Sequence, residues 1–171
     1  MATKRDHLRA LGRVCRQLGG KLAIISQRAF DDLFYRDQKD WEGLTTAPFT
    51  DAHGLHWRKK VIYAVRGREE VGSIIHEMGH VFCSQHHAEC YCNKCPHEWD
   101  WFGWEIAVAR RIGASRTWSR HNKNYQIDDA PIFSQWESLS SKRRREVVTD
   151  RLAYAKKIGV LTPTDVPRSI R

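Results

Sequence analysis

The chain has 171 residues, 41% of them hydrophobic and seven of them tryptophan, which is enough for one globular domain with a sizeable core. This composition excludes a disordered protein, and no apolar run approaches the length of a membrane span. The net charge of +9 is concentrated at the ends, with +5 in residues 1–21 and +6 in residues 142–171. Basic ends suit an anionic partner such as nucleic acid or an acidic protein, with a solvated basic surface as the alternative. The charged helical start lacks a signal-peptide core, so a cytoplasmic protein is expected.

The first 65 residues predict a mixed series of short elements. Apolar residues three and four apart indicate a first helix, which two consecutive glycines end. Compact β-branched runs indicate strands, and a stretch containing Gly43 and Pro48 is typical of a loop. The expected elements are a helix over 3–18, a strand over 21–26, a short helix over 27–35, a loop over 37–50, and two short strands within 54–65 joined by a turn at 58–60.

The most informative stretch is Val71–Phe82, whose apolar residues fall on one stripe of a helix. On this helix His76 and His80 lie one turn apart, so both imidazoles can bind a single metal ion. A zinc ion held by two histidines and a carboxylate keeps one position open for water, whose pKa it lowers to about 7. Glu77 can take the proton of that water and pass it to a leaving amine. The alternative is a buried helix with two hydrogen-bonded histidines.

The second half of the chain predicts long helices around a polar segment. The helix of the His-Glu motif is expected to run to about residue 86, followed by helices over 98–112 and 141–158. Residues 115–132 are polar and are expected to be mostly irregular. Two members of this segment, His121 and Tyr125, are hypothesised to stabilise an oxyanion.

A third metal ligand is expected downstream of the two histidines. Glu105 lies on an otherwise apolar helix face, where an ionised carboxylate needs a partner such as a metal or a base from another element. His86 is the second contender because HEMGHVFCSQH matches a three-histidine pattern, although Cys83 replaces the glycine of that pattern. With His86 as third ligand the site would be metzincin-like. His97 is the third contender.

The cysteines predict a second metal site. Four of the five are crowded into thirteen residues, which in a reducing compartment favours metal ligation over disulfides. Cys90, Cys92 and Cys95 have a spacing suited to a structural zinc, with Cys83 or His87 as the fourth ligand. Free thiols in a loop are the alternative.

A family resemblance rests on a strand that leads into the His-Glu helix, VIYAVRGREEVGSIIHEMGH, and on a later helix with Trp104-Glu105-x-Ala107. With these features residues 54–112 resemble the ImmA/IrrE family of zinc metallopeptidases. The resemblance implies that Glu105 completes the metal site and that a transcriptional regulator is a possible type of substrate; such proteins are frequent in phages. The cysteine-rich insertion departs from the family pattern. A thinner similarity to archaemetzincins rests on the histidine pattern and a nearby cysteine-bound zinc.

The sequence therefore predicts one zincin-like α+β domain over residues 1–171, with a small mixed or antiparallel sheet packed against several helices. A cysteine-rich zinc-binding insertion is expected at about 83–97. The expected function is zinc-dependent hydrolysis of a peptide bond in a protein substrate. The rival class is a non-catalytic, metal-stabilised protein whose basic ends bind nucleic acid or a host protein.

Overall fold

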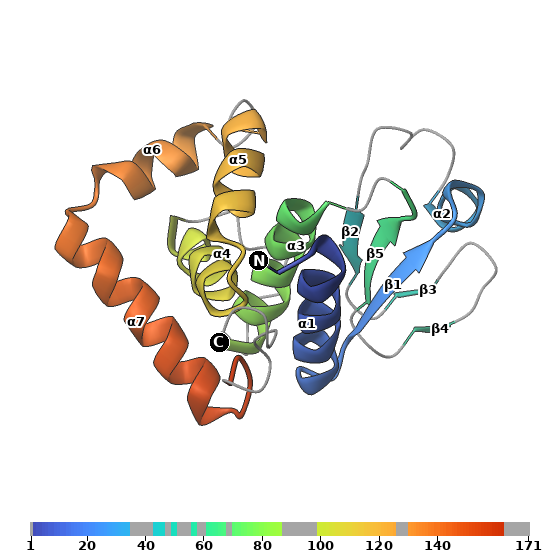
Figure 1. The fold of residues 1–171 in the computed structure, drawn as a ribbon, viewed down its shortest axis with the longest axis horizontal. Helices are drawn as coiled ribbons and strands as arrows, with labels where there is room; N and C mark the ends of the chain where they lie inside the picture. Colours follow the sequence, from blue (N-terminus) through green and yellow to red (C-terminus); the bar gives the residue numbers. More distant parts are fainter. Residues whose placement is uncertain are drawn as a thin grey trace.

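The computed structural model describes residues 2–34, 43–46, 49–50, 56–57, 61–67, 70–86, 99–125 and 130–162. In chain order the elements are α1 (Lys4–Gln17), β1 (Lys21–Ile25), α2 (Gln27–Phe34), β2 (Gly43–Thr46), β3 (Phe49–Thr50), β4 (His56–Trp57), β5 (Val61–Val65), α3 (Val71–His86), α4 (Trp99–Arg111), α5 (Ser115–Tyr125), α6 (Ala130–Ser138) and α7 (Ser141–Lys157). The predicted α+β class is confirmed. Helix α3 lies in the middle, with α1 and the sheet on one side and α4 to α7 on the other (Figure 1).

The main sheet has three strands in the order β1-β5-β2, with β1 parallel and β2 antiparallel to β5. Strand β5 is buried along its whole length because both faces of the sheet are covered. Ile62 and Ala64 of this strand belong to the main core, which α1 and α3 share. The alternating residues on the other face pack with Phe30 of α2. A strand buried on both faces thus leads the chain into α3.

Helix α3 has the apolar stripe that the sequence predicted. Its members are at most 4% exposed, and they are Val71, Ile74, Ile75, Met78 and Phe82. The helix contacts α1, α4 and α5 as well as β2 and β5. Because so many elements pack on it, α3 is a rigid base for the His-Glu motif.

The first and last helices begin within one residue of their expected starts, and each has a side-chain cap. The backbone N–H of Asp6 donates to Thr3 Oγ1 at 3.2 Å, and the Thr3 N–H donates to Asp6 Oδ2 at 2.9 Å. Together these bonds form a capping box. At the other end of the chain, Ser140 caps α7, and Gly159 follows the helix with a φ of 76°.

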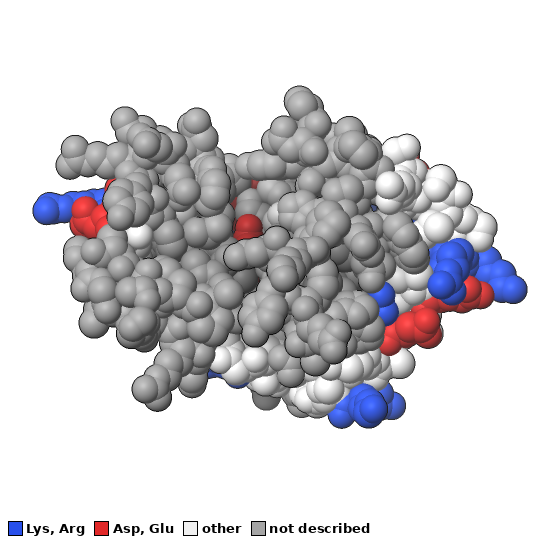
Figure 2. Space-filling model, turned by 180° about the vertical axis from the view of Figure 1, so that it is seen from behind, with Lys and Arg blue, Asp and Glu red and all other residues white. Residues whose placement is uncertain are grey.

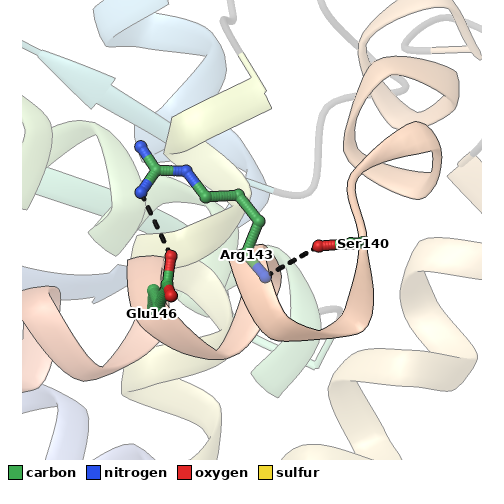
Figure 3. Close-up of polar contacts among 3 residues, drawn as sticks. All are labelled: Ser140, Arg143 and Glu146. Carbon is green, nitrogen blue, oxygen red and sulfur yellow. Dashed lines mark hydrogen bonds and ion pairs between the residues drawn. The ribbon is translucent and has the colours of Figure 1, made fainter.

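Helix α7 carries exposed side chains of both signs. Seen from behind, Lys and Arg side chains lie next to Asp and Glu side chains in this part of the surface (Figure 2). At its start Ser140 Oγ accepts from the Arg143 N–H at 3.1 Å, and Arg143 Nη1 lies 3.3 Å from Glu146 Oε2 (Figure 3). The acidic side chains therefore partly neutralise the basic run at 142–145.

Two expectations of irregular structure were wrong. The expected loop over 37–50 contains β2, which pairs with β5, and β3, which pairs with β4. Strand β2 includes Leu44 and two β-branched threonines, and its partner strand supplies the hydrogen bonds that stabilise it. A run of four residues is too short to show the alternation of polar and apolar side chains by which a strand is recognised in a sequence.

The described residues of the polar segment over 115–132 are helical, since they belong to α5 and to the start of α6. Ala114, Trp118 and His121 are spaced at i, i+4 and i+7 and form a single inward face in an otherwise polar sequence. In α6, Pro131 occupies the first turn, where the helix does not need its missing N–H. The high polarity of residues 115–125 concealed the amphipathic character of α5.

The two strands expected within 54–65 correspond to β4 and β5, which pair in different sheets. The turn expected between them at 58–60 lies outside the described residues. None of the described helices has both the length and the apolar character that crossing a membrane requires.

The contact between α4 and α7 depends on Gly103. A Cβ atom at this position would lie 2.6 Å from Val147 Cγ1. We expect Gly103→Ala to lower the free energy of unfolding by about 1–3 kcal/mol, because the two helices must separate to admit the methyl group. Urea unfolding followed by circular dichroism measures the change.

Gly12 in α1 is the matched control, because the nearest side-chain atom to a Cβ there is 3.8 Å away. Gly12→Ala is expected to leave stability unchanged or to raise it by up to about 1 kcal/mol, through the better helix propensity of alanine. Equal losses in the two variants would contradict the close approach of α4 and α7.

Candidate metal centre

The His-Glu motif lies on the side of α3 away from its apolar stripe. The side chain of His76 is 28% exposed, and Glu77 beside it is half-buried. His80 follows one helical turn later, and its side chain is outside the described residues. The motif therefore starts on a buried helix but presents its first two functional side chains at the edge of solvent.

Helix α4 brings a carboxylate to this motif. Glu105 is 2% exposed and lies among core residues, as the sequence predicted for the apolar face of its helix. Its Oε1 atom is 3.3 Å from His76 Nδ1. Two residues far apart in the sequence, predicted as ligands of one ion, are thus neighbours in the fold.

Helix α5 supplies a third member that the sequence reasoning missed. The indole N–H of Trp118 donates to Glu105 Oε2. This bond holds one oxygen of the carboxylate and leaves the other directed at His76. Trp118 could have been found only by recognising α5 as a helix, because its inward face places Trp118 and His121 together.

The free lone pairs of Glu105 Oε1 provide a test of whether a metal fits. Within the described residues this buried atom accepts no hydrogen bond, since the contact with His76 lacks the geometry of one. Two ligands of a tetrahedral zinc, with bonds of about 2.0–2.2 Å, lie about 3.3–3.5 Å from each other. The separation of 3.3 Å between His76 Nδ1 and Glu105 Oε1 therefore fits two ligands of one ion.

Among the described side chains, no three His, Cys, Asp or Glu residues gather into a metal site. His76 and Glu105 make a pair, and the predicted third member, His80, is described only in its backbone. Its place on α3 is nevertheless fixed, about 6 Å along the helix axis from His76. Both histidines and the carboxylate have donor atoms of the kind that zinc binds.

The continuous course of α3 bears on the alternative ligand His86. The helix passes through Cys83 without a break and ends at His86. At 1.5 Å per residue, His86 is about 15 Å along the axis from His76, too far for both to reach one ion. The described backbone favours Glu105 over His86.

The two residues hypothesised to stabilise an oxyanion both lie on α5. His121 is 9% exposed, and it packs so closely on α3 that a Cβ at Gly72 would lie 2.2 Å from its own Cβ. Gly72 is one turn before His76, so His121 is one turn away from the motif. Tyr125 is the last residue of α5, and its side chain is outside the described residues.

The predicted cysteine site is not described. Cys90, Cys92, Cys95 and His87 lie outside the described residues, as does His97, and Cys83 is described only as backbone of α3. Cys15 is a different kind of cysteine. It is fully buried in α1, and burial raises the pKa of its thiol to about 11, which makes it an inert core residue.

Comparisons of the chain with models of known protein families, with curated proteins and with solved structures found no match.

The bond from Trp118 to Glu105 can be measured as a contribution to stability. We expect Trp118→Phe, studied with a chelator present, to lower the free energy of unfolding by about 1.5–3 kcal/mol, because a buried charged acceptor loses its donor. Urea unfolding measures the loss.

The control for this experiment is the same change in a Glu105→Leu background, where the acceptor is absent. Trp118→Phe should then cost clearly less, and the difference is the coupling between the two side chains. An identical cost in both backgrounds would mean that the hydrogen bond does not stabilise the protein.

Proposed function

We propose that the chain is a zinc-dependent peptidase with a zincin-like site, in which His76, His80 and Glu105 hold the metal. The observation that carries the proposal is the position of Glu105, a carboxylate buried to 2% exposure and facing His76 at 3.3 Å from a neighbouring helix. A buried carboxylate is costly without a cation or a strong donor. A metal shared with His76 supplies the cation.

Zinc bound by these residues would act as a Lewis acid on a carbonyl group and would make water more acidic. The side chains of the protein carry out the proton transfers. Glu77 is adjacent to His76 on α3 and half-buried, so its carboxylate has access to solvent and would lie near a metal held by His76. In the proposed mechanism a Glu77 carboxylate oxygen accepts the proton of the attacking water and then donates it to the leaving amine nitrogen.

Trp118 has a positioning role in this proposal. Its N–H holds Glu105 Oε2, so Oε1 keeps its direction toward His76. Partners of this kind orient metal ligands and raise the affinity for the ion. In the free protein the same bond stabilises a carboxylate that has not yet bound its metal.

Of the two candidates for oxyanion stabilisation, His121 is the nearer to His76. Trp118 donates to Glu105, which faces His76, and His121 packs against Gly72. The order of these contacts along the two helices shows that α5 runs antiparallel to α3 (Figure 1). Tyr125 is one turn further along α5, beyond the N-terminal end of α3. His121 is therefore the residue that we propose for this role.

A protein substrate is proposed from the resemblance of residues 54–112 to the ImmA/IrrE family. A second zinc on Cys90, Cys92 and Cys95, with Cys83 or His87, stays a prediction of the sequence. It would join the end of α3 to the start of α4 and so keep Glu105 close to His76.

Zinc content is the direct test of the ligand set. Purified protein is expected to contain two zinc ions per chain, Glu105→Ala one, and Glu77→Gln two, as measured by elemental mass spectrometry. Circular dichroism confirms that each variant is folded. Two zinc ions in folded Glu105→Ala would show that Glu105 pairs with a protonated His76 instead of binding metal.

Peptide hydrolysis tests the role of Glu77. Glu77→Gln is expected to retain its zinc but to cleave fluorophore-labelled casein about 10²- to 10⁴-fold more slowly, because the proton acceptor is lost. Glu70→Gln is the matched control, since Glu70 is exposed at the start of the same helix. Unchanged cleavage by Glu77→Gln would exclude Glu77 as the proton acceptor, whereas no cleavage by the unmodified protein would favour the non-catalytic binding protein.

A further inference from the structure

A groove of about 510 Å³ runs between α1 and β1 on a part of the surface that the proposed peptidase does not use. Its described lining residues are Arg5, Leu8, Arg9, Gly12, Arg13, Arg16, Leu22 and Ile24. The floor is aliphatic, and four arginines form the wall on the α1 side. No acidic residue is among these lining residues.

The four arginines lie on one face of α1. Arg5, Arg9, Arg13 and Arg16 are spaced by four, four and three residues, and all four are exposed. Along the helix axis they extend over about 16 Å. Because α1 packs on α3 and β1, the backbone positions of the four arginines form a rigid series with regular spacing.

Asp6, the acidic residue of this segment, interacts with the charge of Arg9 and offsets only part of the series. Asp6 is the single Asp or Glu in residues 1–21, and its carboxylate is bound within the capping box. Asp6 Oδ2 accepts from the N–H of Thr3 at 2.9 Å and from Thr3 Oγ1 at 2.8 Å. These bonds hold the carboxylate at the helix start.

The other basic end of the chain has a different character. The depression along α7 is lined by Lys142, Arg143 and Arg145 but also by Glu146 and Asp150. Basic and acidic side chains lie side by side there (Figure 2), and Arg143 is paired with Glu146 (Figure 3). Mixed charge attracts an anion less strongly than the acid-free groove on α1.

We propose that the arginine face of α1 binds the phosphodiester backbone of duplex nucleic acid without sequence preference. Guanidinium forks match phosphate oxygens, and a regular series of cations matches the regular repeat of charge along a duplex. Among the described lining residues there is no aromatic ring on which an unpaired base could stack, which favours a duplex over a single strand. The aliphatic floor suits contact with sugars. An acidic peptide would match the arginines only if its carboxylates were spaced at the same intervals as the guanidinium groups.

The test measures binding of a fluorescein-labelled 20-bp DNA duplex by fluorescence polarisation over a series of salt concentrations. With about four phosphates contacted, the logarithm of the association constant should fall against the logarithm of salt concentration with a slope of about −3.6. Two duplexes of equal length and different sequence should bind equally, and a single strand of the same length should bind more weakly.

Arg5→Gln/Arg9→Gln is expected to reduce the slope to about −1.8 and to weaken binding about 60-fold at 0.1 M salt, because two phosphate contacts are lost. Lys142→Gln/Arg145→Gln is the control, since it removes the same charge from exposed positions on α7. The control should lower affinity by less than about threefold. Circular dichroism confirms folding of both variants.

Equal losses in the two double variants would overturn the proposal, because binding would then depend on net charge alone. Tighter binding of the single strand would also overturn it. Poly-glutamate is the remaining probe: if it binds as tightly as the duplex and loses as much affinity in Arg5→Gln/Arg9→Gln, the groove is a site for acidic peptides instead. Weak binding of poly-glutamate supports the duplex.

Discussion

The arrangement of the helices around the His-Glu motif depends on one buried carboxylate. Glu105 is enclosed by the core, and its two oxygens are turned in different directions, one toward Trp118 and the other toward His76. Three helices therefore have to meet at fixed distances. A carboxylate in such a place is destabilising unless its environment compensates it, so its presence in an otherwise apolar face of α4 indicates a function more than a contribution to folding.

The main parts of this centre could be predicted from the sequence because their signals are local. The apolar stripes of α1, α3 and α7 repeat within a few residues, and each helix was found close to its expected position. Glu105 could be predicted for the same reason, since a lone acid on an apolar helical face is visible without knowledge of the fold. Its contact with His76 then follows from the packing of α3 on α4.

The parts that could not be predicted depend on contacts between distant segments. Strand β2 has four residues and is stabilised by pairing with β5. No local sequence pattern predicts this pairing. Helix α5 appeared irregular because its inward face contains a tryptophan and a histidine in place of aliphatic residues. Missing α5 meant missing Trp118, and hence the donor that fixes the carboxylate. His121 and Tyr125 of α5 were named from the sequence, but Trp118 was not, because the polarity of this segment obscured its helical periodicity.

The absence of a side chain at Gly72 has a consequence for residues that it does not touch. Because His121 occupies the space where a methyl group would be, even alanine there would push α5 outward. Trp118 also lies on α5 and would move with it, which would pull its indole away from Glu105 on α4. Gly72 thereby determines the position of a carboxylate on α4 through its contact with α5. A survey of tolerated substitutions should find position 72 as intolerant as the motif itself, despite its having no functional group.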